Sequence, residues 1–192
     1  PNQVIDAISD YYRGYNSNVH RAAHYLADKA TQAFEGAREK VADFINSPSS
    51  KQVIWTRGTT ESINLVAYSW GTANLKPGDK ILASALEHHS NIVPWQVVAE
   101  KTGASVVEVP VTEIGEVDLE AFDRLLDDRV RMVVISHISN ALGTVNPIKE
   151  IARRAHDAGA LVMVDGAQAV AHAQVDMQSL GADFYAFSGH KM

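Results

Sequence analysis

The sequence predicts an α/β fold: a mainly parallel, seven-stranded-type sheet with helices on both faces, preceded by a helical arm. From Gln52 onward, short runs of β-branched and aliphatic residues alternate with helical segments. These runs are almost continuously apolar, which is typical of strands buried on both faces of a parallel sheet. The residues before them show helical spacing instead. We therefore expect a helical arm over residues 1–50 and an α/β large domain over residues 51–192.

The individual elements follow from the same patterns. In the arm, we predict a helix over residues 3–13 and a longer one over about 20–46. Apolar residues at intervals of three and four predict a core-facing stripe along the longer helix. The stripe consists of Val19, Ala22, Ala23, Leu26, Ala30, Ala33, Phe34, Ala37, Val41, Phe44 and Ile45. The predicted strands cover 53–55, 81–83, 106–109, 130–135, 161–164 and 183–187, and the helices between them cover 60–73, 91–102, 118–127 and 147–158.

Composition limits the classes of function. The 192 residues are 46% hydrophobic and 21% charged, ordinary values for a globular core, and no apolar run approaches the roughly 20 residues of a membrane span. The formal net charge is −6 and Lys and Arg form no cluster, which argues against nucleic-acid binding. There is no cysteine, so these residues hold no disulfide, thiolate metal site or cysteine nucleophile. We expect a cytoplasmic protein with no membrane partner and no metal.

In parallel sheets, ligands bind outside the carboxyl ends of the strands, so the residues that follow each apolar run are the candidates for a site. After the first run come Gly58, Thr59 and Thr60 at the start of a predicted helix. Free backbone N–H groups and two hydroxyls there could bind a phosphate. Simple N-capping by Thr59 is the alternative.

The second and fourth runs are followed by groups with one obvious use each. His88 and His89 follow the second run, and adjacent histidines on a strand cannot chelate one metal together. One of them could lay its ring against a ligand, although a lone histidine at a strand end is more often structural. Asn140 follows the fourth run and offers an amide to a ligand oxygen, or serves as a turn residue before Gly143.

Asp165 gives the sharpest signal, because it ends a run of four apolar residues. A carboxylate is costly to bury unless it meets a cation, and a protonated pyridine nitrogen would be such a partner. Capping of a following helix is the alternative. Gln168 stands three residues further on and could donate its amide to an oxygen of the same ring.

The last run delivers Ser188, His190 and Lys191. Ser188 and His190 could reach a phosphate, and a lysine in a dry site can lose its proton and attack a carbonyl carbon. Taken alone, Lys191 reads as an exposed charged tail. Suitable groups at five strand ends are much less expected by chance, and together they favour a pyridoxal-phosphate site.

These residues form motifs that resemble the class V aminotransferase family, and more narrowly its cysteine desulfurase branch of the SufS/CsdA type. The motifs are Asn18–Arg21, Arg57–Asn64, Glu87–Trp95, Val164–Gln168 and Ser188–Lys191. They occur in the expected order over essentially all of the sequence. The resemblance implies the large domain of a fold-type I enzyme that uses pyridoxal 5′-phosphate and is normally a homodimer.

The resemblance also implies a role for each candidate. Lys191 would hold the cofactor covalently and move the substrate proton, and His88 would stack on the pyridine ring, so these two would be catalytic. Asp165 would pair with the ring nitrogen and Gln168 with the ring oxygen. The phosphate would be bound by Thr59, Thr60, Ser188 and His190. Asn140 would lie near the ring oxygen and the substrate carboxylate, and His20 and Arg21 would lie near the site.

The implied reaction converts L-cysteine to L-alanine and passes the sulfur to an enzyme cysteine as a persulfide, for iron–sulfur cluster assembly or another sulfur-transfer pathway. Selenocysteine lyase, another class V enzyme, or a non-catalytic scaffold of the same fold are the alternatives. The family's persulfide cysteine, its substrate-binding arginine and its small C-terminal domain lie beyond the lysine. We therefore expect a truncated large domain that binds the cofactor and releases little or no sulfur.

Overall fold

The computed structural model describes residues 1–21 and 23–192 and divides the chain into two compact units, residues 1–54 and 55–192. Ala22, which we assigned to the apolar stripe, lies outside the described residues. No helix in the described part of the chain combines the length and the apolar character that crossing a membrane requires.

The first unit contains α1 (Asn2–Gly14) and α2 (Tyr25–Phe44). The predicted start of the long helix at residue 20 is wrong, because His20 has a left-handed backbone with φ of 59° and His24 is extended. A left-handed residue cannot continue a right-handed helix. The predicted core-facing stripe is also wrong in part, because Leu26 and Phe44 are 40% and 54% exposed.

The strand predicted at residues 53–55 is absent from the sheet. The chain forms a 3₁₀ turn, η1 (Ser50–Gln52), and the backbone N–H of Val53 donates to the carbonyl of Ser50. The guanidinium of Arg38 donates to the carbonyl of Val53. These contacts satisfy backbone groups that a sheet ladder would otherwise use, and β-branched composition alone does not supply a neighbouring strand.

The second unit is built on a parallel sheet of five strands in the order β2-β1-β3-β4-β5, so the prediction of a parallel sheet is confirmed. The described residues form five strands in this sheet rather than seven. The strands are β1 (Lys80–Ser84), β2 (Ser105–Val109), β3 (Val130–Ser136), β4 (Leu161–Asp165) and β5 (Phe184–Ala186).

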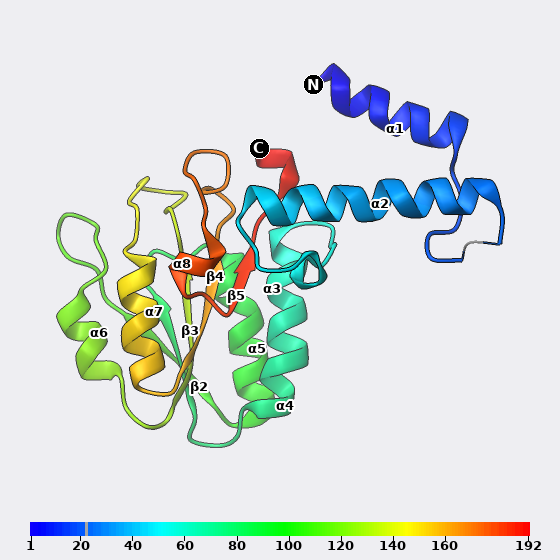
Figure 1. The fold of residues 1–192 in the computed structure, drawn as a ribbon. Helices are drawn as coiled ribbons and strands as arrows, with labels where there is room; N and C mark the ends of the chain where they lie inside the picture. Colours follow the sequence, from blue (N-terminus) through cyan, green and yellow to red (C-terminus); the bar gives the residue numbers. More distant parts are fainter. Residues whose placement is uncertain (22) are drawn as a thin grey trace. The chain divides into compact units, whose positions relative to one another are not determined.

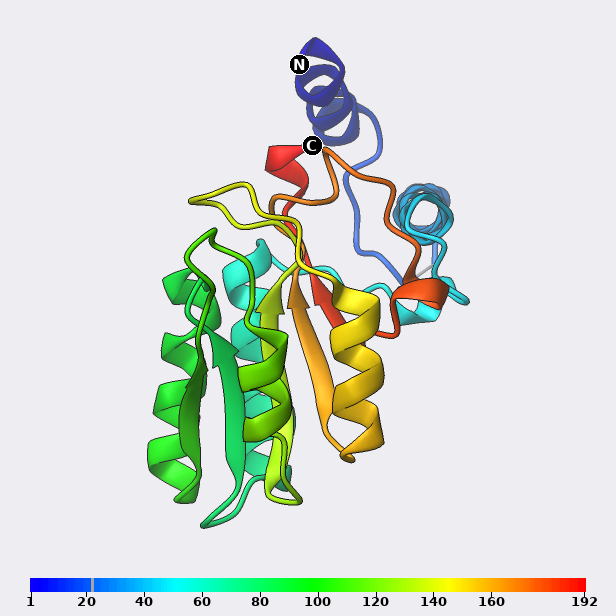
Figure 2. The same cartoon turned by 90° about the vertical axis from the view of Figure 1, so that its left-hand side faces the viewer.

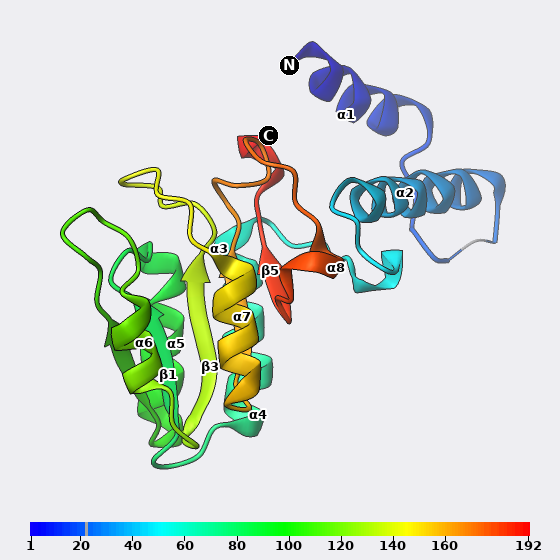
Figure 3. The same cartoon turned by 60° about the vertical axis from the view of Figure 1, so that its left-hand side comes forward.

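Helices cover both faces of the sheet (Figure 1). One face carries α3 (Thr59–Val66), which runs through a π-helical turn (Ala67–Gly71) into α4 (Thr72–Asn74), and α5 (Val93–Thr102). The other carries α6 (Leu119–Leu125) and α7 (Ile148–Asp157), which face the viewer in Figure 3. The short elements are η3 (His89–Asn91), α8 (Met177–Leu180) and η4 (Gly189–Lys191).

Local sequence explains where these helices begin and end. The side chain of Asp118 caps α6 by accepting hydrogen bonds from the backbone N–H groups of Glu120 and Ala121. In α5, Pro94 stands in the first turn, and Gly103 ends the helix with φ of 77°. Both are typical helix boundary residues, because proline lacks the N–H that a first turn leaves unpaired and glycine accepts the left-handed conformation.

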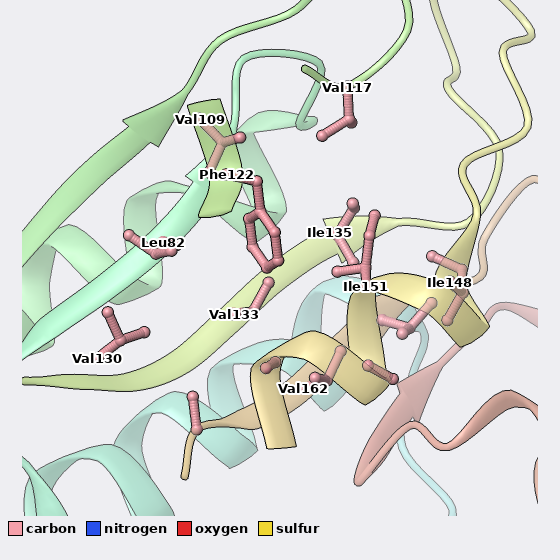
Figure 4. Packing of buried hydrophobic residues seen from close by; sticks show 14 residues of the cluster. Leu82, Val109, Val117, Phe122, Val130, Val133, Ile135, Ile148, Ile151 and Val162 are labelled. Atoms are coloured by element: carbon pink, nitrogen blue, oxygen red, sulfur yellow. The ribbon is translucent and has the colours of Figure 1, made fainter. Parts of the chain in front are cut away.

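Two apolar clusters hold the layers together. Phe122 of α6 points toward Val133 of β3, and Ile151 of α7 lies beside Ile135 (Figure 4). On the opposite face, Trp95 of α5 is fully buried. Each fully buried large side chain of this kind contributes roughly 2 kcal/mol relative to exposure. These clusters fix the helices on the sheet. The loops at the strand ends can then build a site on this rigid support.

The strand order places that site. From β1 the chain crosses to β2 at one edge and then returns past β1 to β3, so the direction of winding reverses between β1 and β3. A crevice forms at such a reversal, outside the carboxyl ends of the strands. Figure 2 shows the loops that follow β3, β4 and β5 leaving the sheet at the carboxyl ends of the strands, at the top of the view.

Candidate active site

A cavity of about 180 Å³ opens at the carboxyl edge of the sheet. Its lining contains all nine residues that the sequence singled out for the cofactor, although they come from five separate segments of the chain. These residues are Thr59, Thr60, His88, Asn140, Asp165, Gln168, Ser188, His190 and Lys191. The lining also includes Ser90, Ser136, Ile138 and Ala167, which the sequence did not single out.

Thr59 and Ser188 join the start of α3 to the end of β5. Thr59 donates its backbone N–H to the Ser188 hydroxyl at 2.9 Å, and the two hydroxyl oxygens lie 2.7 Å apart. Both residues are buried. Gly58 makes this approach possible, because its φ is 149° and a Cβ there would lie 3.2 Å from the Ser188 oxygen. The two residues are 129 positions apart in the sequence, and their contact forms one polar corner of the cavity, the Thr59–Ser188 corner.

This corner has hydrogen-bond donors that remain available to a ligand. One of the two hydroxyls donates to the other, so the proton of the remaining hydroxyl stays available to a ligand whichever way the pair is oriented. The first N–H groups of α3, including that of Thr60, have no partner inside the helix. Together with the positive end of the helix dipole, these donors suit a phosphate.

Asp165 ends β4 as a buried carboxylate. Its Oδ1 accepts the backbone N–H of Ala167 at 2.9 Å, and no hydrogen bond to Oδ2 is found among the described residues. Burial raises the pKa of the Asp165 carboxyl, and the Ala167 bond and the charges of His88 and Lys191 offset part of that rise. The carboxylate therefore has an acceptor oxygen left for a cationic ligand.

Tyr185, which packs on the face of the sheet covered by α6 and α7, holds the turn after Asp165 in place. The Tyr185 ring lies against Gly166, where a Cβ would come within 2.1 Å of the ring. Tyr185 shares a hydrogen bond of 2.9 Å with Nδ1 of His137, whose backbone N–H donates to the Asp165 carbonyl. Burial raises the pKa of the Tyr185 hydroxyl and lowers that of the His137 imidazole, so both remain neutral at pH 7.

His88 is oriented by its own turn. Its Nδ1 accepts the backbone N–H of Ser90 at 3.1 Å and lies 2.8 Å from the Ser90 hydroxyl. Because Nδ1 is the acceptor, a neutral His88 carries its proton on Nε2. The ring is exposed in the cavity wall, so one face of it is available to a flat ligand.

The lysine and the two amides complete the wall. Lys191 is exposed in η4, directly after the exposed His190, and its charge lowers the pKa of Asp165. Asn140 lies on the exposed loop after β3, and Gln168 is half-buried after β4. His20 and Arg21 belong to the first unit, so their place near the site stays a prediction.

Sequence reasoning gave no role to Glu87, although the residue stood inside a recognised motif. It is buried between the loop after β1 and the end of β3, where its carboxylate accepts hydrogen bonds from three residues. A glutamate beside an apolar strand was the available signal. The donor from β3, the backbone N–H of Ser136, lies 49 residues away and could not be read from spacing.

Three comparisons relate this geometry to known proteins. The family model described as Aminotransferase class-V matches residues 1–192. A probable cysteine desulfurase of Vibrio cholerae is 55% identical over 192 residues, which cover 100% of this chain and 48% of the relative. The chain thus spans about half the length of this relative.

Two solved structures share the fold. The cysteine desulfurase CsdA (S-sulfonic acid) of Escherichia coli matches with a TM-score of 0.90 and 44% identity, over 100% of this chain and 48% of that one. A structure described as SspA in complex with cysteine matches with a TM-score of 0.91 and 25% identity, over 100% of this chain and 54% of that one.

Proposed function

The chain belongs to the class-V aminotransferase family, and on that premise we propose that it carries the cofactor site of a pyridoxal-phosphate-dependent cysteine desulfurase. The observation that supports this best is the convergence of nine polar residues from five segments on one cavity. The activity named for the similar proteins and the bound cysteine named for one of them support the substrate, L-cysteine.

The donor set fits pyridoxal phosphate. The Thr59–Ser188 corner and the start of α3 offer donors to the phosphate, with Thr60 and His190 beside them in the lining. The free oxygen of Asp165 offers an acceptor to a protonated ring nitrogen. Lys191 supplies a primary amine for the aldehyde, and a phosphate, a cationic ring and an aldehyde are the three recognition features of this cofactor.

When bound, the cofactor supplies a pyridine ring that accepts electrons from the substrate Cα. The charged carboxylate of Asp165 would keep the ring nitrogen protonated and so favour that flow. His88 would cover one face of the ring, and Gln168 and Asn140 would donate their amide hydrogens to the ring oxygen. Lys191 would hold the group covalently, and its uncharged Nζ would take the proton from the substrate Cα.

The overall reaction balances without an external oxidant or reductant. L-cysteine and an acceptor thiol give L-alanine and a persulfide. The substrate Cβ–S bond and the acceptor S–H bond break, and an S–S bond and a Cβ–H bond form. Because the 192 residues contain no cysteine, the acceptor thiol would belong to a residue outside them. The homodimer, the role in iron–sulfur assembly, the sulfur-acceptor protein and the cytoplasmic location remain predictions.

Cofactor capture tests the proposal directly. The purified 192-residue protein is titrated with pyridoxal phosphate, reduced with borohydride, and mapped by peptide mass spectrometry. We expect saturable visible absorption and a pyridoxyl label on Lys191, lost in Lys191→Ala and kept in Lys149→Ala, which changes an exposed lysine of α7. A protein that stays colourless, or that carries the label at other lysines equally, would contradict the proposal and favour a non-catalytic scaffold.

A further inference from the structure

Glu87 lies at the reversal point of the sheet, outside the cavity lining, where it bridges the ends of β1 and β3. Its Oε1 accepts the hydroxyl of Ser84, the last residue of β1, at 2.6 Å. The same oxygen accepts the backbone N–H of Ser136, the last residue of β3, at 2.8 Å. Its Oε2 accepts the amide of Asn91 at 2.6 Å. One buried carboxylate thus gathers donors from three elements.

These bonds enclose the turn that carries His88. Glu87 precedes His88 in the chain, and the backbone N–H of Asn91 donates to the His88 carbonyl at 2.8 Å. Asn91 is itself fully buried. The turn is therefore fastened on both sides of the histidine, and the Ser90 contacts then set the ring itself. The position of the exposed His88 ring therefore depends on the buried hydrogen bonds of Glu87 and Asn91.

We propose that Glu87 is a positioning residue of the cofactor site, whose carboxylate ties the turn that carries His88 to the carboxyl end of β3. The inference rests on the proposed function, since it concerns how His88 meets the cofactor. Glu87 lies outside the cavity lining and would not contact the cofactor itself. The carboxylate acts through His88, so its removal moves the ring without removing it.

The chemistry of the pocket around Glu87 explains why hydrogen bonding, rather than packing, is the property that matters. Replacement by alanine leaves the Ser136 N–H and the Asn91 amide without an acceptor, and buried unpaired donors force a turn to rearrange. Glutamine keeps the shape and one acceptor oxygen. Its amide nitrogen meets the Asn91 amide, whose Oδ1 has no partner among the described residues and can turn to accept it. Glu87→Gln is thus the folded, conservative variant.

The charge of Glu87 changes near neutral pH, which gives the test a second readout. Burial raises the pKa of its carboxyl to about 7, against three hydrogen bonds that lower it, and the charge of Asp165 raises it further. Its hydrogen-bond partners from β1, η3 and β3 are the neutral Ser84, Asn91 and Ser136, so Asp165 of β4 is the charged neighbour that bears on it.

A double-mutant cycle on the 192-residue protein tests the proposal, with pyridoxal phosphate as the probe. Its dissociation constant and induced circular dichroism are measured for Glu87→Ala, Glu87→Gln, His88→Ala and both double variants. We expect Glu87→Ala to weaken binding about tenfold and change the induced signal, and to weaken it less than about twofold once His88 is already alanine. The dissociation constant of Glu87→Gln should lie between those of the unmodified protein and Glu87→Ala. Its circular dichroism signal should lose any pH dependence near pH 7.

The controls separate the possible failures. Glu100→Gln, an exposed glutamate of α5, should match the unmodified protein throughout. If the unmodified protein binds no cofactor, the proposed function fails. If it binds and Glu87→Gln matches it in affinity, signal and pH profile, the positioning role fails alone. Equal effects of Glu87→Gln with and without His88 would also overturn it, because the carboxylate would then act independently of the ring. Should Glu87→Ala not fold, the glutamine cycle decides.

Discussion

Two buried carboxylates lie at the carboxyl edge of the sheet, and their surroundings differ. Glu87, between β1 and β3, accepts hydrogen bonds from three donors of the protein. Asp165, at the end of β4, accepts one and lines the cavity. Burial raises the pKa of both. A carboxylate surrounded by its own protein's donors builds a framework, whereas one with an unused acceptor oxygen is prepared for a ligand.

If Glu87 belongs to the framework, its ionisation should be visible in stability. Its folded pKa of about 7 lies above the usual 4.5, so the fold favours the protonated form. That contribution is fully present below pH 4.5 and is lost as the pH rises through about 7. The unfolding free energy of the unmodified protein, relative to Glu87→Gln, should fall by roughly 3 kcal/mol over this window. Urea unfolding of the cofactor-free proteins between pH 4.5 and 8 measures this difference.

The subtraction cancels the other titrating groups, which are shared by the two proteins. Because the charge of Asp165 raises the pKa of Glu87, the same comparison in an Asp165→Asn background should move the fall to lower pH. A pH-independent difference would show that Glu87 does not titrate in this range. The two carboxylates would then differ in their hydrogen-bond partners alone.

If Asp165 instead serves a ligand, its replacement should affect stability and binding in opposite directions. Asp165→Asn can still accept the Ala167 N–H, while it removes a desolvated charge. We expect the cofactor-free protein to become slightly more stable and the affinity for pyridoxal phosphate to fall by about 10- to 100-fold, as for the loss of a charged hydrogen bond. Thermal unfolding without cofactor and a spectroscopic titration measure the two effects. A loss of stability without cofactor would place Asp165 in the framework beside Glu87.

The same contrast explains which parts of the site could be predicted from the sequence. Asp165 was found because it ends an apolar run, and Lys191 because it stands in the short polar segment after the last one. The carboxyl ends of parallel strands share one edge, so both were expected there. Glu87 acquired no role because its partner Ser136 belongs to a strand that folding brings alongside. Residues that face a ligand are marked by their own chemistry, while framework residues are marked by partners distant in the chain.

The fold shows the same division between local and distant information. The helices and the parallel strands were predicted because apolar spacing is a local property. The strand expected at 53–55 failed because its pattern is equally local and says nothing of a neighbouring strand. Likewise, the left-handed backbone of His20 has no signature in apolar spacing, so the start of the long helix was missed. The π-helical turn at Ala67–Gly71 lies inside the helix predicted at 60–73 and was not foreseen for the same reason.

The smallest expected effect lies at the corner where framework and ligand site meet. Ser188→Ala leaves the buried N–H of Thr59 without its acceptor and should cost about 1–2 kcal/mol of unfolding free energy in the cofactor-free protein. The exposed Ser105→Ala, at the start of β2, should cost less than about 0.5 kcal/mol in the same urea titration. Ser188→Ala should also weaken phosphate binding, because it removes the Ser188 hydroxyl and the hydrogen bond that holds the Thr59 hydroxyl in place. A stability loss with unchanged cofactor affinity would assign this pair wholly to the framework, as with Glu87, and unchanged stability with weakened affinity would assign it to the ligand, as with Asp165.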